Sequence, residues 1–347
     1  MKTLKDFNFE NKRVLVRCDF NVPVDENNKI LDDYRILQSL PTIKYLLEKN
    51  AKIILMSHLD PESTGVADKK YNLNNVGKKL SELLDLPIIK IDDCVGAEAE
   101  TQSKNLKSKE ILLLENLRFH KEETDGDIEF AKKLSLLGEV YVNDAFSVCH
   151  RNHASISELP KLMEKCAGLL LENEIKNLDK VLQNPEHPMT AIVGGKKVET
   201  KSKFIDKISE VADCVIVSGP IQKEIIDKKI DLKHPEKIIS PKNDLTALDI
   251  DQKTAKIFKE KIMQSKTILW NGPFGKFEDE KYVAGTFTIA MAIIESKAFS
   301  VVGGGETVEF LQKQGMINKF SWVCTGGGAM LNYLSGDELP GLLSLGK

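Results

Sequence analysis

A short glycine turn late in the chain reads Val301-Val302-Gly303-Gly304-Gly305-Glu306-Thr307, a hydrophobic run followed by glycines and then by helical spacing. Glycine lets the backbone approach a phosphate closely, and the free amides at a helix N-terminus favour an anion. Two further turns share this layout, Ile192-Val193-Gly194-Gly195-Lys196-Lys197 and Val323-Cys324-Thr325-Gly326-Gly327-Gly328. Three of them at the predicted ends of strands favour a nucleotide site over simple tight turns.

None of these turns matches the Walker A spacing or completes G-x-G-x-x-G, so a P-loop or a standard dinucleotide site is not expected. After the first turn, Lys197 and Lys201 are four residues apart at the predicted opening of a helix. Both ammonium groups then reach one side, which suits a polyphosphate. The alternative is an ordinary solvated basic face.

Around these turns the chain alternates β-branched runs, turns and helical stretches, which is typical of a parallel α/β fold. Its 347 residues exceed what one core usually organises, so two domains are expected. Two prolines at Pro185 and Pro188 place a boundary near residues 184–188, and Gly168 to Gln183 is predicted to be the joining helix. The predicted strands are 13–17, 52–56, 88–91, 110–114 and 139–142, then 189–193, 214–217, 237–240, 267–270, 299–302 and 321–324. The helices predicted in the first half include 34–50, 73–84 and 127–137.

The composition, with 41% hydrophobic and 29% charged residues, is that of an ordinary globular protein. A net charge of -3 argues against bulk nucleic-acid binding. The apolar runs are too short to span a membrane, and the N-terminus lacks the apolar region of a signal peptide, so we expect a cytoplasmic protein. The six cysteines form no C-x-x-C pair, which indicates neither a zinc site nor a disulfide framework.

The first half carries basic residues at or just beyond the predicted strand ends. Because arginine binds carboxylate and phosphate oxygens in a bidentate manner, several converging arginines would bind a small, highly charged anion. Asp19 and Asn21 could accept hydrogen bonds from ligand hydroxyls, although Asp19 could equally pair with an arginine. The basic residues are Arg17, Arg35, His58, Arg118, His150, Arg151 and His153.

Segments along nearly the whole chain resemble the phosphoglycerate kinase family. In the first half they are residues 13–23 (Arg-Val-Leu-Val-Arg-Cys-Asp-Phe-Asn-Val-Pro), 33–36, 56–59, 113–120 and 142–146. In the second half they are residues 194–198, 269–278 (Leu-Trp-Asn-Gly-Pro-Phe-Gly-Lys-Phe-Glu), 303–307 and 325–329. Each segment is weakly specific alone, but their number and order favour this family.

This resemblance implies two Rossmann-like three-layer αβα domains whose parallel sheets face a cleft. It predicts a domain for 3-phosphoglycerate or 1,3-bisphosphoglycerate over 1–167, an interdomain helix over 168–185 and a nucleotide domain over 186–329. It also predicts that the C-terminal segment 330–347 returns to the first domain. Most of this segment, about Tyr333 to Lys347, is predicted to be a helix. A monomer that closes by hinge bending is expected.

The resemblance also implies roles for individual residues. The acceptor side would use Arg17, Asp19, Asn21, Arg35, His58, Arg118 and Arg151, with His150 and His153 in the same basic patch. The nucleotide side would use Gly195, Lys197, Lys201, Gly219, Asn271, Pro273, Glu278, Gly303, Gly304, Gly305, Glu306 and Thr307 for ATP or ADP, with Glu306 near Mg²⁺. Transfer would be assisted by Arg35, Lys197, Gly304, Gly305 and Gly327. No general base is needed, because a carboxylate nucleophile is already ionised at pH 7.

Four departures from the family pattern stand out. Asp60-Pro61 replaces Gly-Arg-Pro and removes one arginine, Thr200 stands where an aspartate is usual, and Glu306 replaces an aspartate. The segment 218–244 is shorter than usual, which bears on the adenine pocket. Two rival hypotheses are a related binding or regulatory protein that has lost turnover, and a cysteine hydrolase built on Cys149 and His150. The second is disfavoured if these neighbours lie in a strand and point to opposite faces.

Overall fold

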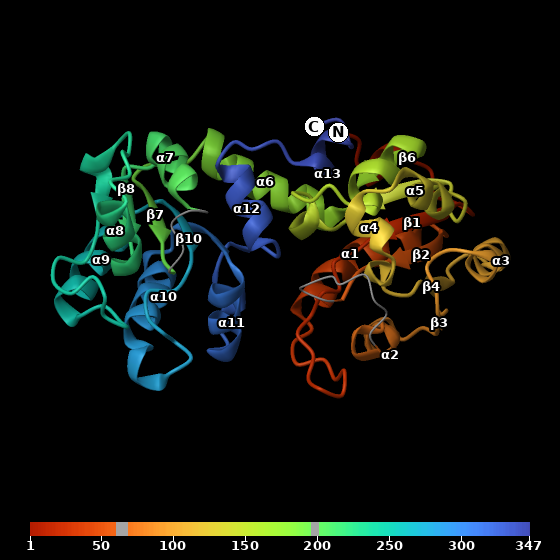
Figure 1. The fold of residues 1–347 in the computed structure, drawn as a ribbon, viewed down its shortest axis with the longest axis horizontal. Helices are drawn as coiled ribbons and strands as arrows, with labels where there is room; N and C mark the ends of the chain where they lie inside the picture. The colour runs from red at the N-terminus through yellow and green to blue at the C-terminus, as the bar shows by residue number, and fades with distance from the viewer. Residues whose placement is uncertain (60–68, 196–200) are drawn as a thin grey trace. The chain divides into compact units, whose positions relative to one another are not determined.

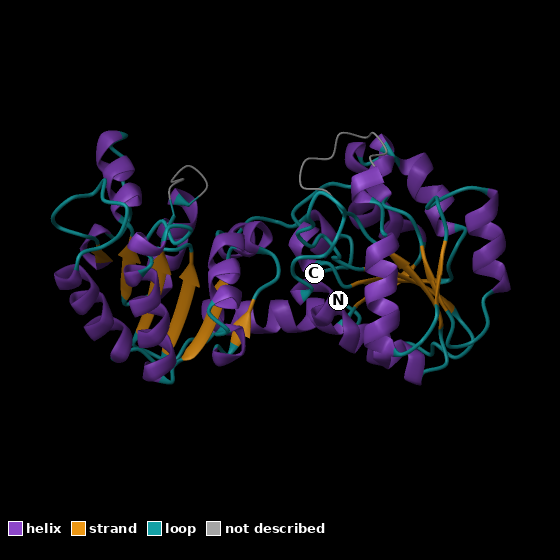
Figure 2. Ribbon diagram, turned by 90° about the horizontal axis from the view of Figure 1, so that it is seen from below, coloured by secondary structure: helices purple, strands orange, loops and turns teal. Residues whose placement is uncertain are grey.

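The computed structural model describes residues 1–59, 69–195 and 201–347. The chain forms two compact units, Met1–Glu174 with Glu338–Lys347, and Ile175–Asp337. Each unit contains a parallel six-stranded sheet with helices packed around it (Figures 1 and 2). The predicted α/β class with two such domains is therefore confirmed.

The sheet of the first unit has the strand order β3-β4-β2-β1-β5-β6. The last residue of β1, Arg17, pairs in register with Met56 at the end of β2 and with Asn143 at the end of β5. The residues that follow these three strands therefore emerge at one edge of the sheet. The strands are β1 (Arg13–Arg17), β2 (Lys52–Met56), β3 (Ile88–Lys90), β4 (Ile111–Leu113), β5 (Val140–Asn143) and β6 (Glu164–Ala167).

The helices of the first unit cover this sheet with apolar faces. In α1 the buried residues Ile36, Leu40 and Ile43 recur at helical spacing and join the core that contains Val14 and Val16 of β1. The α-helices are α1 (Tyr34–Glu48), α2 (Asn74–Leu84), α3 (Ala97–Asn105), α4 (Lys121–Asp125), α5 (Ile128–Ser135) and α13 (Pro340–Leu343). The short 3-10 and π turns are η1 (Leu4–Asp6), η2 (Lys69–Tyr71), η3 (Leu117–Phe119), η4 (Phe146–Val148), η5 (Ala154–Glu158) and η6 (Leu159–Leu162).

The sheet of the second unit has the order β12-β11-β10-β7-β8-β9. Asn271, the last residue of β10, pairs with Val193 of β7 and with Gly303 of β11, so the glycine turns after these strands share one edge. The strands are β7 (Met189–Val193), β8 (Cys214–Val217), β9 (Ile238–Ile239), β10 (Thr267–Asn271), β11 (Phe299–Gly303) and β12 (Trp322–Val323). Helix α6 (Leu169–Gln183) begins in the first unit and ends in the second. The other helices of the second unit are α7 (Ser202–Val211), α8 (Gly219–Asp227), α9 (Gln252–Met263), α10 (Ala284–Ser296), α11 (Gly305–Lys313) and α12 (Gly327–Leu334), with 3-10 turns η7 (Pro235–Lys237), η8 (Glu280–Tyr282) and η9 (Ile317–Lys319).

The C-terminal segment returns to the first unit and carries a helix, as predicted, but the predicted helix bounds of Tyr333 to Lys347 are wrong. Helix α12 ends at Leu334, where Gly336 follows the C-cap residue Ser335 with a left-handed φ of +77°, and only the short α13 follows, beginning at Pro340. The segment that joins the first unit begins at Glu338 and not at residue 330, since Met330 packs against Gly303 within the second unit. Gly341 packs on Cys149 and Ile156.

The predicted joining helix is α6, and the division between the two units falls inside it, between Glu174 and Ile175. None of the helices within residues 1–59, 69–195 and 201–347 is both long and apolar enough to cross a bilayer.

Candidate active site

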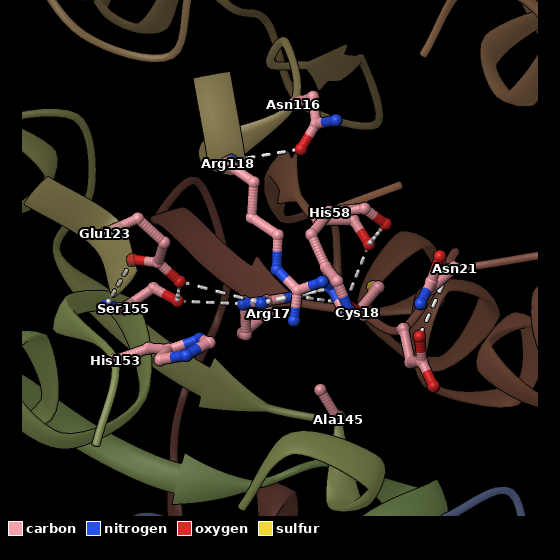
Figure 3. Close-up of polar contacts among 12 residues, drawn as sticks. Arg17, Cys18, Asn21, His58, Asn116, Arg118, Glu123, Ala145, His153 and Ser155 are labelled. Carbon is pink, nitrogen blue, oxygen red and sulfur yellow. Dashed lines mark hydrogen bonds and ion pairs between the residues drawn. The ribbon is translucent and has the colours of Figure 1, made fainter. Parts of the chain in front are cut away.

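Arg17 lies at the end of β1 and is completely buried. Its Nε donates to Ser155 Oγ at 2.9 Å and its Nη1 to the Cys18 carbonyl at 2.7 Å. Both terminal nitrogens lie 3.2 Å from Nδ1 of His58 (Figure 3). A guanidinium can only donate, so Nδ1 of His58 is the acceptor and the proton of the neutral ring is on Nε2.

His58 follows β2 and is 1% exposed. Burial, followed by repulsion from Arg17, Arg118 and Arg35, holds the pKa of His58 well below its usual range. Burial also lowers the pKa of His153 to about 3, with further repulsion from Arg118 and Arg17. Both imidazoles are therefore neutral at pH 7, and the positive charge of the site is carried by arginines.

The remaining basic residues belong to the same group. Arg118 lies in η3 and is 8% exposed, and its side chain extends toward Arg17 (Figure 3). The charge of Arg151 acts on His150 and on His153, and burial lowers the pKa of His150 to about 4. We call the seven residues Arg17, Arg35, His58, Arg118, His150, Arg151 and His153 the basic cluster.

Arg35 reaches the cluster from the first turn of α1, not from a strand end as predicted. Its Nη1 lies 3.0 Å from Asp19 Oδ2 and donates to the Asn21 carbonyl at 3.1 Å. Asp19 is buried and also accepts from Ser147 Oγ at 2.5 Å. Of the two roles predicted for Asp19, the structure shows the pairing with an arginine. This ion pair orients Arg35, whose side chain remains 31% exposed.

Glu123 is a residue of this site that the sequence analysis missed. It is fully buried in α4, and its Oε1 lies 3.7 Å from Nη2 of Arg17. Its carboxylate also accepts from the backbone N and the hydroxyl of Ser155, at 2.9 and 2.5 Å. No signal in the charged stretch from Lys121 to Asp125 separates this glutamate from its solvated neighbours.

In the second unit the first glycine turn lies against the turn that follows β10. A Cβ on Gly194 would lie 2.2 Å from the Gly272 carbonyl oxygen and 2.3 Å from that of Pro273. Backbone bonds join the turns, since Gly194 N donates to Asn271 O and Gly195 N to Pro273 O, both at 2.8 Å. Glycine is required here by close approach of two backbones.

The other two glycine turns also meet. A Cβ on Gly327 would lie 2.7 Å from Cα of Gly304, which precedes α11 with a φ of +103°. Gly305 and Gly327 are the first residues of α11 and α12, and a Cβ on Gly305 would meet nothing within 4 Å. Two helix N-termini with free amides therefore lie side by side, which suits an anion.

Asn271 and Thr307 are buried and hold these turns together. Asn271 Nδ2 donates to the Gly303 carbonyl at 3.1 Å, and Thr307 Oγ1 accepts from Gly272 N at 2.8 Å. Neither side chain lines the cavity described next.

A cavity of about 840 Å³ opens beside these turns within the second unit. One part of its wall is apolar and comes from Pro220, Phe274, Leu245, Ala247 and Leu248, while Gly195, Lys201 and Glu306 line another part. Pro273 and Glu278 also line it, and Gly219 packs directly against Leu245 in its wall. The short segment 218–244 thus still supplies a wall through α8, and the size suits a nucleotide.

Lys201 precedes α7 and its ammonium donates to the Gly194 carbonyl. Burial lowers its pKa to about 8, while the negative charge of Glu306 opposes that shift. Glu306 is exposed in the first turn of α11. Lys197, Thr200 and Asp60-Pro61 lie outside the described residues.

The cysteine hydrolase hypothesis fails on the environment of Cys149. This residue follows η4 and is not in a strand, so the argument from opposite strand faces was wrong. The thiol is fully buried, its Sγ donates to the Ala145 carbonyl at 3.5 Å, and burial raises its pKa to about 12. A thiolate nucleophile is therefore absent at neutral pH.

Comparison with known proteins assigns the family. The phosphoglycerate kinase pattern matches residues 4–231 and 222–337. The chain belongs to the phosphoglycerate kinase family. It is 42% identical to the phosphoglycerate kinase of Finegoldia magna and 40% identical to that of Hydrogenobaculum sp., covering 98% of this chain in both and 98% and 97% of those proteins.

Solved structures agree with this assignment. The phosphoglycerate kinase of Pyrococcus horikoshii aligns with a TM-score of 0.88 at 33% identity, covering 100% of this chain and 98% of that one. The Coxiella burnetii phosphoglycerate kinase aligns with a TM-score of 0.83 at 30% identity, covering 99% and 98%. The resemblance inferred from the sequence motifs is confirmed, and members of the phosphoglycerate kinase family are phosphotransferases.

Proposed function

We propose that the chain catalyses reversible phosphoryl transfer between 1,3-bisphosphoglycerate and ADP, giving 3-phosphoglycerate and ATP in glycolysis. The observation that carries this proposal is that, in a chain of the phosphoglycerate kinase family, one unit holds a buried basic cluster and the other holds a nucleotide-sized cavity at converging glycine turns. The cluster is suited to a small polyanion, and the cavity to a nucleotide.

In this proposal the acceptor binds the basic cluster together with Asp19 and Asn21. Two carboxylates, Glu123 and Asp19, pair with Arg17 and Arg35, so these arginines are held in place before a ligand arrives. His58 contributes an Nε2–H donor and no charge, because Arg17 occupies its Nδ1. The positive charge supplied by arginine is thus fixed in position, which reduces the ordering cost of binding.

The nucleotide base is assigned to the apolar part of the cavity and the phosphates to the part lined by Gly195 and Lys201. The amides at the starts of α11 and α12, at Gly304, Gly305 and Gly327, are assigned to the transferring phosphoryl group. Glu278 in the cavity wall is assigned to the ribose. Asn271 and Thr307 shape the turns and so support the site indirectly.

Mg²⁺ is expected to accompany the nucleotide. Glu306 fits such an ion, because its carboxylate is exposed at the cavity and magnesium prefers one or two carboxylates together with substrate phosphates and water. The ion would neutralise phosphate charge when bound. The chain's own contribution is the fixed amides and cations around it.

Catalysis then rests on positioning and on charge. The attacking carboxylate or ADP oxygen is ionised at pH 7, so no side chain has to remove a proton. Arg35 and Lys197 are assigned to the charge that spreads over the equatorial oxygens during transfer. Because the two substrates are assigned to different units, the reaction requires the units to close on one another by a hinge motion. We further propose that the enzyme acts as a cytoplasmic monomer.

A coupled assay with 3-phosphoglycerate and Mg-ATP tests this function. Arg35→Ala and Lys197→Ala should each lower kcat by about a hundredfold or more, since charge stabilisation in the transition state is worth several kcal/mol. Lys207→Ala is the matched control, because Lys207 pairs with Glu210 on the surface of α7. Absence of turnover with both ligands bound would instead support the regulatory alternative, and a rise in KM alone would reduce both residues to binding contacts.

A further inference from the structure

A second group of polar side chains lies in the first unit, outside the basic cluster. Asp93 and Cys94 belong to the loop after β3, and His120 lies between η3 and α4. One ligand atom from each residue, a carboxylate oxygen, Sγ and a ring nitrogen, can be chosen so that all lie within 4.8 Å of one another. The phosphotransferase reaction uses none of them.

The three side chains are already oriented. His120 Nε2 lies 2.7 Å from Asp93 Oδ1, and the His120 ring packs on Phe130 with centroids 5.2 Å apart. The backbone N of Cys94 donates to the same Asp93 oxygen at 2.6 Å, which fixes the loop. The side chains of His120 and Asp93 are 29% and 50% exposed, so an ion can enter from the solvent side. Cys94 is fully buried and burial raises the pKa of its thiol, so the bound ion has to displace the thiol proton to solvent.

The three ligand atoms lie within 4.8 Å of one another and the His120–Asp93 pair is 2.7 Å apart, so these values lie on either side of the ligand spacing around one metal ion. With Zn–S near 2.3 Å and Zn–N and Zn–O near 2.0–2.2 Å, the ligands of a tetrahedral ion lie roughly 3.3–3.6 Å apart. Binding of an ion therefore requires the 2.7 Å pair of His120 Nε2 and Asp93 Oδ1 to move apart to this spacing. One sulfur, one nitrogen and one oxygen form a donor set that favours zinc-type ions over Mg²⁺, which prefers oxygen.

We propose that Asp93, Cys94 and His120 form a site for a zinc-type divalent ion, with a fourth position open to solvent. No sequence motif indicates this site, because Cys94 has no C-x-x-C partner and His120 is distant in the chain. The site is separate from the proposed Mg²⁺ at Glu306, which belongs to the second unit.

Cobalt(II) titration of the full-length, metal-stripped protein tests the proposal, because a thiolate bound to Co²⁺ gives a charge-transfer band in the near ultraviolet. The wild type should give this band with one equivalent of Co²⁺, and one equivalent of Zn²⁺ should abolish it. Cys94→Ala should lose the band. His120→Gln should weaken binding by at least about tenfold, since even the loss of an outer partner of a metal ligand costs 10- to 100-fold.

Two variants in the second unit are the matched controls. His187 and Asp213 form a similar pair at 2.6 Å, and His187→Gln should leave the band unchanged, as should Cys214→Ala. Zn²⁺ should also raise the Tm of the wild type but not that of Cys94→Ala. A wild type without a saturable band, or a band that persists in Cys94→Ala, would overturn the site. If Cys94→Ala does not fold, Co²⁺ binding by His120→Gln and by Asp93→Asn tests the site instead. Co²⁺ affinity equal to that of the wild type in both variants would refute the metal site.

Discussion

Removing the buried carboxylate of Glu123 should destabilise the first unit strongly. Glu123 and Arg17 are both 0% exposed, and 3.7 Å separates their charged atoms. Breaking a buried ion pair from one side typically costs about 3–5 kcal/mol, because the remaining charge stays buried. Arg17 keeps Ser155, Cys18 and His58 as partners, so we expect Glu123→Ala to lower the free energy of unfolding by about 3 kcal/mol, at the low end of this range.

Glu123→Gln should lower the free energy of unfolding by less than Glu123→Ala does. Glutamine is about the same size as glutamate, and its amide oxygen can still accept a hydrogen bond from the backbone N of Ser155. Urea unfolding should be followed by far-ultraviolet circular dichroism, since the two tryptophans, Trp270 and Trp322, both lie in the second unit. Glu164→Ala is the control, because Glu164 pairs with Lys2 in solvent and should matter little. A loss below about 1 kcal/mol for Glu123→Ala would refute the pairing argument.

Three further predictions concern pH and backbone packing. Burial raises the pKa of Asp144 to about 7, so the folded state binds more protons than the unfolded state between about pH 4 and pH 7. The free energy of unfolding should therefore fall by at most about 4 kcal/mol as pH rises across this window. Asp144→Asn should remove most of this pH dependence in urea titrations. Lys201, whose pKa burial lowers to about 8, should lose its charge as pH rises past 8, so the KM for ATP should increase from pH 7 to pH 9, whereas Lys201→Arg should stay charged and show a flat profile. Gly194→Ala would place a Cβ 2.2 Å from the Gly272 carbonyl oxygen, and kcat/KM should fall by about a hundredfold, with normal activity counting against the close approach.

Much of the fold follows from local patterns in the sequence. Strands such as β1, β2 and β7 are β-branched runs buried on both faces, and their predicted bounds agree with the structure. Strand β6 was missed because Glu164-Lys165-Cys166-Ala167 is half charged, which an edge strand tolerates since one side faces solvent.

The basic cluster was predictable in membership but not in its energetics. Arginine and histidine at the ends of strands indicate an anion site, yet the sequence cannot show that Nδ1 of His58 accepts from Arg17. It also cannot show which acid is buried, because Glu123 looks like its neighbours until α4 packs against η5. Partner choice between distant elements is a tertiary property, and a single sequence carries no local signal for it.

The division of the chain has a consequence for the order of its synthesis. The second unit is an insertion in the first, since Glu338–Lys347 returns to pack where Gly341 meets Cys149 and Ile156. A ribosome makes this segment after all of residues 175–337. The first unit therefore starts first and is completed last, with an apolar patch uncovered while the second unit is produced. In the growing chain, the second unit can therefore complete its fold before the first unit does.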